Sequence, residues 1–286
     1  MTLPADGIYT GLTFAEYHSW EAASHSRLRD LARSPAYCRL RTTTPDAGTT
    51  AKDSGTVVHA LVLEGTIEGR FHLKDYEARS AESKAKVQAA KDAGLLVVTP
   101  DELRDAEAIA ASVLAHRRAS ALTAKAQRRE VSIVWTDPTT GIRCKARPDA
   151  MADVRGRRIL VDLKRIRHAH PDDFPRGMLD LDIDSQMAWY RDGLRALGWA
   201  PDDVVIVAVL PDAPHEVWCH RLTDDVLTRG VMRNEKAVKV YAECVRTGVW
   251  PGGSEDVVEA DLPEWEKKRV ATLMQVEQFT EGGETL

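Results

Sequence analysis

The stretch RCKARPDAMADVRGRRILVDLK, residues 143–164, decides the fold of this chain. It holds two runs of β-branched or alternating apolar residues, at 143–153 and 158–164, and a turn signal at 155–156 separates them. A third run, EVSIVW at residues 130–135, precedes them. Short runs of this kind, joined by turns, predict three consecutive strands that form a meander.

Charged residues recur inside these predicted strands. Asp149 falls in the second strand and Asp162 in the third, and Lys164 follows Asp162 by two residues. Because side chains alternate along a strand, Asp162 and Lys164 face the same side. Asp162 interrupts an apolar run, where an unpaired carboxylate is costly to bury without a cation or hydrogen bonds. The cluster is therefore either a site of chemistry or a structural ion pair of Lys164 with one of the carboxylates.

Helices surround the predicted strands. Apolar residues at helical spacing predict helices over residues 26–37, 56–64, 82–93, 100–124 and 183–197. Thr99 is the expected cap of the fourth helix, and Gly198 ends the fifth. Two further strands are predicted over residues 203–210 and 216–222. Helices before and after a central mixed β-sheet indicate an α/β, or α+β, fold.

No repeat, low-complexity tract or long linker divides the chain. We expect one domain over residues 1–286, with a helical N-terminal segment at about 14–125, a core at about 126–250 and a C-terminal tail at about 251–286.

Composition narrows the class of protein. The chain has 286 residues, of which 43% are hydrophobic and 29% charged, as in soluble globular proteins. No stretch approaches the roughly 18 apolar residues of a membrane span, and the N-terminus lacks the pattern of a signal peptide. We therefore expect a cytoplasmic protein that makes no membrane contact. The cysteines are scattered singly, which predicts reduced structural thiols and neither a zinc ribbon nor an iron–sulfur cluster: Cys38, Cys144, Cys219 and Cys244.

The formal net charge of -5 argues mildly against a protein that coats nucleic acid in general. Three local basic clusters could still line a groove that follows phosphates, although each alone is more simply a solvated surface. They are Arg27, Arg29 and Arg33; Lys125, Arg128 and Arg129; and Arg155, Arg157 and Arg158.

Five motifs in order resemble a known nuclease family. Pro148-Asp149, the triplet Asp162-Leu163-Lys164 and QMAWY at residues 186–190, with Glu130 upstream, resemble the PD-(D/E)XK nuclease core in its RecB-like form. Two further stretches are GTVVHALVLE at 55–64 and SRL with SPAY at 26–28 and 34–37. Together with TGIRCKARPD at 140–149, which contains the Pro-Asp motif, they resemble the RecE-type exodeoxyribonucleases (exonuclease VIII) of the lambda-exonuclease-like branch. The resemblance covers residues 17–265 and implies a restriction-endonuclease-like core.

This resemblance implies a metal site. Asp149 and Asp162 would bind Mg²⁺ or Mn²⁺ as oxygen ligands, with the backbone carbonyl of Leu163 as a third. His59 is similar to the RecB-type histidine that completes a metal site, and Glu130 to the acidic residue that serves a second metal or its water. Taken without the resemblance, His59 is more simply a packed helical residue and Glu130 an exposed strand-end carboxylate.

The resemblance also implies catalytic and DNA-binding roles. Lys164 would orient or help to deprotonate the attacking water and stabilise the charge that develops on the phosphate. Gln186 and Tyr190, one helical turn apart, would reach the same DNA strand or the lysine; otherwise Tyr190 is a core residue. The expected DNA contacts are completed by residues of the N-terminal segment and by the residue after the lysine, where these nucleases often carry Thr: Ser26, Arg27, Ser34 and Arg165.

The implied activity is that of a 5′→3′ exonuclease on linear double-stranded DNA ends, which leaves 3′ single-stranded tails for recombination of the phage type. A ring-shaped homo-oligomer, a RecT-like single-strand annealing partner and a phage or prophage origin in a bacterial host are implied with it. Two alternatives stay open. One is a RecB-like nuclease of other polarity, or with single-strand or endonucleolytic specificity. The other is a catalytically silent scaffold that binds DNA ends.

Overall fold

The computed structural model describes residues 3–44, 50–77, 80–254 and 256–281. The chain forms two compact units, Met1–Pro251 and Gly252–Leu286. The described part of the second unit includes the helix α11 (Glu264–Glu281). None of the described helices combines the length and the apolar composition needed to cross a membrane. The four cysteines are free.

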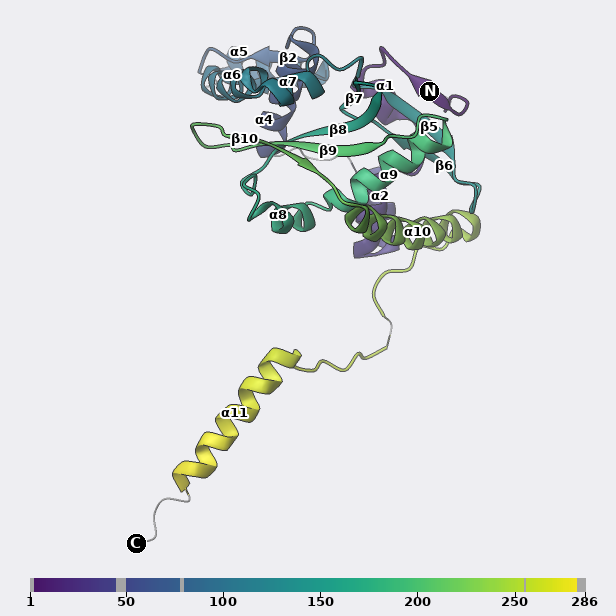
Figure 1. Ribbon diagram of the computed structural model, residues 1–286, viewed down its shortest axis with the longest axis vertical. Helices are drawn as coiled ribbons and strands as arrows, with labels where there is room; N and C mark the ends of the chain where they lie inside the picture. The colour runs from purple at the N-terminus through teal and green to yellow at the C-terminus, as the bar shows by residue number, and fades with distance from the viewer. Residues whose placement is uncertain (1–2, 45–49, 78–79, 255, 282–286) are drawn as a thin grey trace. The chain divides into compact units, whose positions relative to one another are not determined.

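The first unit contains both helices and strands, which follow one another in runs along the chain (Figure 1). Its helices are α1 (Phe14–Ser19), α2 (His25–Arg33), α3 (Pro35–Thr43), α4 (Thr50–His59), the π-helix η1 (Ala60–Glu64), α5 (Ala81–Asp92), α6 (Pro100–Ala115), α7 (Arg117–Leu122), α8 (Phe174–Asp180), α9 (Ile183–Ala196) and α10 (Asp224–Thr247). Its strands are β1 (Gly7–Tyr9), β2 (Phe71–Leu73), β3 (Leu96–Val98), β4 (Arg128–Arg129), β5 (Ser132–Thr136), β6 (Arg143–Ala146), β7 (Ala150–Val154), β8 (Arg157–Arg165), β9 (Asp203–Val209) and β10 (Val217–Arg221).

The central sheet has the strand order β10-β9-β8-β7-β4. Strands β8 and β9 are parallel, and the other neighbours are antiparallel. The sheet is therefore mixed, and the predicted α/β class is confirmed. A second sheet, with the order β1-β5-β6, is antiparallel, and β2 pairs with β3 in a short parallel sheet.

The predicted three-stranded meander is wrong. The run at 143–153 forms two strands, β6 and β7, which belong to different sheets. Pro148 explains the break, because proline lacks the amide that a strand interior must donate to its neighbour. Asp149 therefore lies just before β7 instead of inside a strand, and Glu130 lies between β4 and β5 instead of starting a strand.

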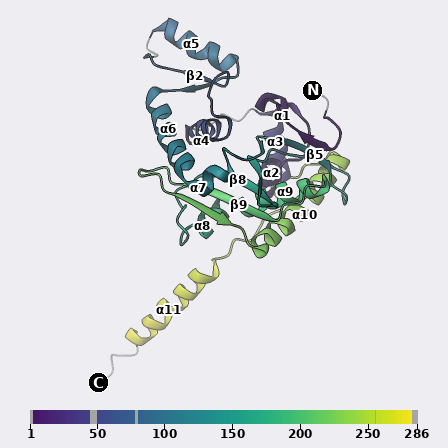
Figure 2. The same cartoon turned by 45° about the horizontal axis from the view of Figure 1, so that its top comes forward.

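Two cores lie on opposite faces of the central sheet (Figures 1 and 2). Leu160 of β8 belongs to the core shared with α2, α9 and α10, whereas Val161 and Leu163 belong to the core shared with α4, α6 and α7. This alternation is the period of a strand that is buried on both faces. Asp162 and Lys164 follow Leu160 at steps of two and so share its face of the sheet.

Caps decide where several helices begin and end. The predicted helix over 26–37 is two helices, because Pro35 cannot continue α2 but suits the first turn of α3. Ser34 caps α3 by accepting a hydrogen bond from the Tyr37 amide at 3.0 Å. The predicted helix over 100–124 likewise divides at His116, whose ring nitrogen accepts from Ala119 N at 3.1 Å. The Thr99 cap of α6 is confirmed.

Candidate active site

Glu130 and Asp149 meet where β4 ends and β7 begins. The Glu130 amide donates to the backbone carbonyl of Asp149 at 2.9 Å. Glu130 has φ +49°, a left-handed conformation that costs energy for a residue other than glycine. Strained backbone of this kind is concentrated at functional sites, where the surrounding structure holds it in place. The bend brings the carboxylates of two separate loops together.

His59 completes a cluster with these two acids. One ligand atom each from His59, Glu130 and Asp149 lies within 4.8 Å of the others. The Nδ1 atom of His59 is 3.6 Å from Asp149 Oδ2 and 4.0 Å from Glu130 Oε1. His59 is the last residue of α4, where the helix changes to the π-helix η1. Single π-turns in helices occur often at functional sites.

Leu163 connects the cluster to β8 through its backbone. Its amide donates to Asp149 Oδ2 at 2.7 Å, and its carbonyl oxygen lies 2.7 Å from Nε2 of His59. A carbonyl only accepts, so Nε2 carries a proton in this hydrogen bond, and Nδ1 is turned towards the carboxylates. The backbone of one strand therefore orients both a carboxylate and an imidazole.

Asp162 and Lys164 form the second part of the site. The Nζ atom of Lys164 lies 2.6 Å from Asp162 Oδ2, which confirms that the two side chains share a face of β8. Asp162 is 1% exposed, and apart from this ion pair its Oδ2 has no hydrogen-bond partner among the described residues. A buried carboxylate oxygen with free acceptor capacity is a suitable ligand for a cation.

The charges of the two parts interact. Burial raises the pKa of Asp149 to about 7, with Asp162 and Glu130 adding to the rise while His59 and Lys164 oppose it. Burial alone would lower the pKa of Lys164, but the carboxylates of Asp162 and Asp149 raise it above its ordinary value. Lys164 is therefore a cation at neutral pH, which favours stabilisation of charge over removal of a proton.

Gln186 and Tyr190 lie on the face of α9 that the sequence predicts. The Gln186 side-chain amide donates to the Tyr190 hydroxyl at 2.9 Å. Burial raises the pKa of Tyr190 far above its ordinary value, and the charges of Asp162 and Asp149 raise it further. Tyr190 is therefore a neutral phenol within electrostatic reach of both carboxylates, and its hydroxyl hydrogen is free to be donated.

Comparison with known proteins places this geometry in a family. Residues 24–261 match the family described as "PDDEXK-like domain of unknown function (DUF3799)", which is most of the chain. The chain belongs to this family of PDDEXK-like domains. No curated protein sequence matches it.

Solved structures support the fold of this PDDEXK-like domain. A crystal structure described as a "putative exonuclease" from Eubacterium rectale superposes with a TM-score of 0.59 at 18% sequence identity, over 89% of this chain and 97% of that chain. A second structure, SSO0001, has a TM-score of 0.30 and 15% identity over 81% of this chain and 88% of that chain, too low a similarity to carry an argument. The first neighbour shows that the fold is shared.

The donor set of the PDDEXK-like domain fits a hard divalent cation. Carboxylate oxygens are the preferred ligands of Mg²⁺ and Mn²⁺, and an imidazole nitrogen is an acceptable addition for Mn²⁺. Glu130, Asp149 and His59 offer such atoms within 4.8 Å of one another, and Asp162 adds a buried oxygen without a hydrogen bond. These four residues would hold the cation, whereas the Leu163 carbonyl, expected as a further ligand, accepts a hydrogen bond from His59 Nε2.

Arg147 is a site residue that the sequence pattern does not single out. Its Nε donates to Glu130 Oε2 at 2.9 Å, and its other nitrogens donate to Ser132 Oγ at 2.9 Å and to the Leu12 carbonyl at 3.1 Å. Its position directly before the Pro-Asp motif was the available signal, because the planar fork of arginine suits a carboxylate.

His25 is a second residue that the sequence does not reveal. Its Nε2 lies 2.8 Å from Ser185 Oγ at the start of α9. Burial lowers the pKa of His25 to about 3, and the charges of Arg29 and Lys164 lower it further. His25 is therefore neutral and connects α2 to the helix that carries Gln186.

The expected DNA contacts of the N-terminal segment have structural partners. Ser26 Oγ lies 3.0 Å from Ser24 Oγ, Arg27 donates to the Tyr241 hydroxyl at 3.2 Å, and Ser34 caps α3. Arg165 lies at the end of β8 with its side chain 24% exposed, and its Nη2 is 3.8 Å from Asp105 Oδ2. The Nε of Arg165 has no hydrogen-bond partner in the described part of the chain.

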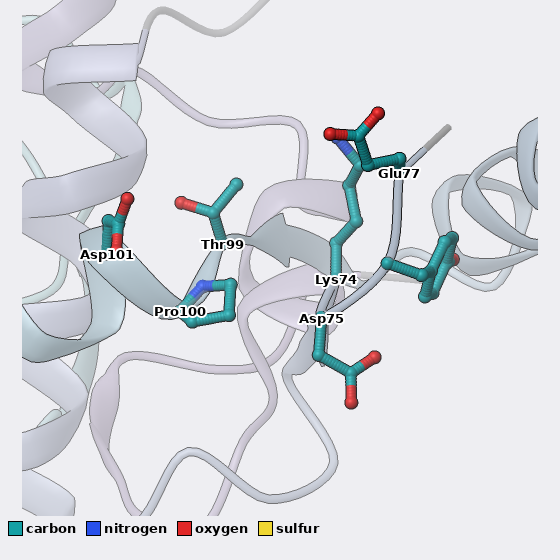
Figure 3. A pocket seen from close by; sticks show the side chains of 7 residues that line it. Lys74, Asp75, Glu77, Thr99, Pro100 and Asp101 are labelled. Carbon is teal, nitrogen blue, oxygen red and sulfur yellow. The ribbon is translucent and has the colours of Figure 1, made fainter. Parts of the chain in front are cut away.

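A pocket at the start of α6 lies apart from the candidate active site. Figure 3 shows it at the start of α6, where Thr99, Pro100 and Asp101 face Lys74, Asp75 and Glu77. Three of its lining residues are acidic and one is basic, which does not suit a phosphate. The hollow has none of the residues of the candidate active site in its lining.

Proposed function

We propose that this PDDEXK-like domain is a metal-dependent 5′→3′ exodeoxyribonuclease that acts on the ends of linear double-stranded DNA and leaves 3′ single-stranded tails. The observation that carries the proposal is the joint presence of Asp149, Asp162 and Lys164 with His59 and Glu130 in one connected cluster. Neighbouring carboxylates repel one another, and a divalent cation and a phosphate would use all of these charged groups.

The metal is proposed to be Mg²⁺, with Mn²⁺ as a substitute, held by Asp149, Asp162, Glu130 and His59. When bound, the cation polarises the scissile phosphate and favours ionisation of water. The protein orients the side chains that would bind this cation. Leu163 holds Asp149 through its amide and His59 through its carbonyl, so both side chains are fixed before a metal or substrate arrives.

Lys164 supplies fixed positive charge beside the scissile phosphate. Asp162 holds its Nζ at 2.6 Å and keeps it protonated, so the ammonium can donate to the phosphate as negative charge develops in the transition state. Tyr190, oriented by Gln186, can donate its hydroxyl hydrogen to a phosphate oxygen or to the attacking water. Arg165 extends the positive charge at the end of β8.

The direction of degradation and the preference for duplex ends rest on the resemblance to RecE-type enzymes, and so do the annealing partner and the ring-shaped oligomer. The N-terminal segment with Ser26, Arg27 and Ser34 is the proposed receptor for the terminal 5′ phosphate. In this structure Arg27 is engaged with Tyr241, so binding of a phosphate would have to exchange that contact.

Three substrates test this proposal. Linear duplex DNA labelled at either the 5′ or the 3′ end, single-stranded DNA of the same sequence, and closed circular duplex are each incubated with Mg²⁺. We expect early release of the 5′ label from the duplex, slower attack on the single strand and an intact circle. Rapid cutting of the circle would indicate an endonuclease, and early release of the 3′ label would reverse the polarity.

A further inference from the structure

Three basic clusters are candidates for contact with DNA beyond the catalytic centre, and the sheet topology separates them. Strand β4 precedes Glu130 directly, and its two residues, Arg128 and Arg129, pair with Met151 and Ala150, the first residues after Asp149. This cluster therefore lies at the catalytic end of the sheet. The hairpin that joins β7 to β8 lies at the other end.

The opposite cluster, at residues 155–158, is remote from the site. Strand β8 runs from Arg157 to Lys164 before it reaches the catalytic lysine, which at strand spacing is roughly 23 Å. Arg157 is also neutralised there, because its Nε and Nη2 both lie within about 3 Å of Asp203 Oδ2. The ion pair of Arg157 with Asp203 stabilises the β7–β8 hairpin, and the cluster is too far from Lys164 to bind DNA next to the active site.

In the α2 cluster, which consists of Arg27, Arg29 and Arg33, two of the side chains already make contacts within the protein. Arg27 donates to the Tyr241 hydroxyl, and Arg33 stacks over the Tyr37 ring with 4.2 Å between the guanidinium carbon and the ring centroid. The β4 cluster differs. Arg128 and Arg129 are both exposed, and neither makes an ion pair with any residue that the structure describes. The guanidinium of Arg129 only donates to the Ala124 carbonyl at 2.9 Å.

The register of the sheet also gives the direction of Arg128. Cross-strand partners point to the same face, so Arg128, Met151 and Leu160 share one face of the sheet. Asp162 and Lys164 follow Leu160 on that face. Arg128 thus offers positive charge on the catalytic face, at the edge of the sheet, next to the strand end that leads into Glu130.

We propose that the β4 edge, with Arg128 on the catalytic face and Arg129 on the opposite face of the same strand, is the surface that binds the phosphate backbone of duplex DNA as it approaches the active site. The inference rests on the proposed nuclease function and names the surface that grips its substrate outside the catalytic centre. Phosphates along a duplex suit two exposed arginines that make no ion pair with a described residue, because each phosphate that they neutralise releases counterions. The ordinary alternative is that charge on an edge strand only prevents pairing with other strands.

The test compares two double variants that remove equal charge. Arg128→Gln with Arg129→Gln changes the β4 edge, and Arg155→Gln with Arg158→Gln changes the remote hairpin. Binding of fluorescent linear duplex is measured by anisotropy in EDTA at several salt concentrations. For the edge variant we expect about tenfold weaker binding, and a slope of log K against log salt that is less steep by about 1.8. The hairpin variant should match the wild type.

The second readout is hydrolysis of a small phosphodiester, which lacks the neighbouring DNA phosphates that the β4 edge would bind. Its rate should be the same for the edge variant and the wild type, since the catalytic cluster is intact, and thermal denaturation should confirm that both variants fold. An edge variant with wild-type affinity and salt slope would overturn this inference while leaving the nuclease proposal standing. A wild type that neither binds nor cuts duplex DNA would overturn both.

Discussion

The Nε atom of Arg147 lies 2.9 Å from Oε2 of Glu130, and the same guanidinium donates to Ser132 and to the Leu12 carbonyl. The other oxygen of this carboxylate, Oε1, is the one that lies 4.0 Å from Nδ1 of His59. One oxygen of the Glu130 carboxylate, Oε2, therefore makes a structural contact with Arg147, and the other, Oε1, faces the candidate metal site. With its side chain 12% exposed, Arg147 holds Glu130 against the repulsion of Asp149.

Replacing Arg147 should loosen this arrangement. We expect Arg147→Lys to weaken Mn²⁺ binding by about tenfold, because lysine cannot reproduce three hydrogen bonds from a planar fork, and partners of metal ligands typically contribute 10–100-fold. Isothermal titration with Mn²⁺ measures the effect, and Arg155→Lys in the remote hairpin is the matched control. Unchanged Mn²⁺ affinity in a folded Arg147→Lys protein would show that Glu130 needs no such support.

Asp149 should make metal-free stability depend on pH. Its folded-state pKa of about 7 lies above the unfolded value of about 3.9, so the protonated form favours folding. This contribution is fully present below pH about 4 and is lost as the pH rises through about 7. We expect the Asp149→Asn protein to lack this part of the fall in stability with rising pH. Melting temperatures of both proteins in EDTA, from pH 5 to pH 8, measure it, and parallel curves would contradict the assignment.

The same group should couple metal binding to pH in the opposite direction. A ligand must be deprotonated to bind a cation, so the apparent Mn²⁺ affinity should rise as the pH increases towards about 7 and then level off. Titrations at half-unit steps of pH measure this dependence. Affinity that is constant between pH 5 and pH 8 would mean that Asp149 is not a ligand.

Tyr190 should matter through its hydroxyl group alone. We expect Tyr190→Phe to fold normally and to lower kcat on duplex DNA by about tenfold, the effect of losing one hydrogen bond to a charged group. The variant leaves the ring packing of α9 intact, so a fall in melting temperature would point to a structural role instead. The split between kcat and KM decides whether the hydroxyl acts in the transition state or in substrate binding.

Close packing of α9 against α10 requires glycine at position 230. A Cβ atom there would overlap the backbone carbonyl oxygen of Asp184 and approach Ala188 Cβ to 2.8 Å. We expect Gly230→Ala to destabilise the protein by about 1–3 kcal/mol. Gly253→Ala is the control, since nothing lies within 4 Å of the added Cβ. Equal free energies of unfolding for the two variants would show that the helices adjust freely.

The sequence predicts most of the elements that carry the site, because periodicity and caps are local properties. The strand over Arg157–Arg165, the helix over Ile183–Ala196 and the Thr99 cap are all confirmed, with ends that differ by a few residues. Local breaks were harder to place. Pro148 and Pro35 each end an element inside a run that reads as continuous when only the apolar pattern is considered.

The sequence indicates which residues belong to the site, but not the hydrogen bonds that hold them in place. Asp149, Asp162 and Lys164 belong to short motifs, so the resemblance to the nuclease family singles them out. The hydrogen bonds from Arg147 to Leu12 and from His25 to Ser185 join residues more than 130 positions apart. Such pairs depend on the packing of β5 and β6 against the N-terminal segment, and of α2 against α9, which no local pattern encodes. The division of the predicted meander into two sheets has the same origin.

The most direct test of the account is metal-dependent hydrolysis of 5′-phosphorylated linear duplex DNA by the wild type and by Asp162→Asn, with Asp153→Asn near the end of β7 as control. We predict release of mononucleotides in Mg²⁺, none in EDTA, and loss of activity only in Asp162→Asn, because that change removes a buried metal oxygen and the partner of Lys164. Undiminished degradation by a folded Asp162→Asn protein would contradict the central claim that this cluster is the active site.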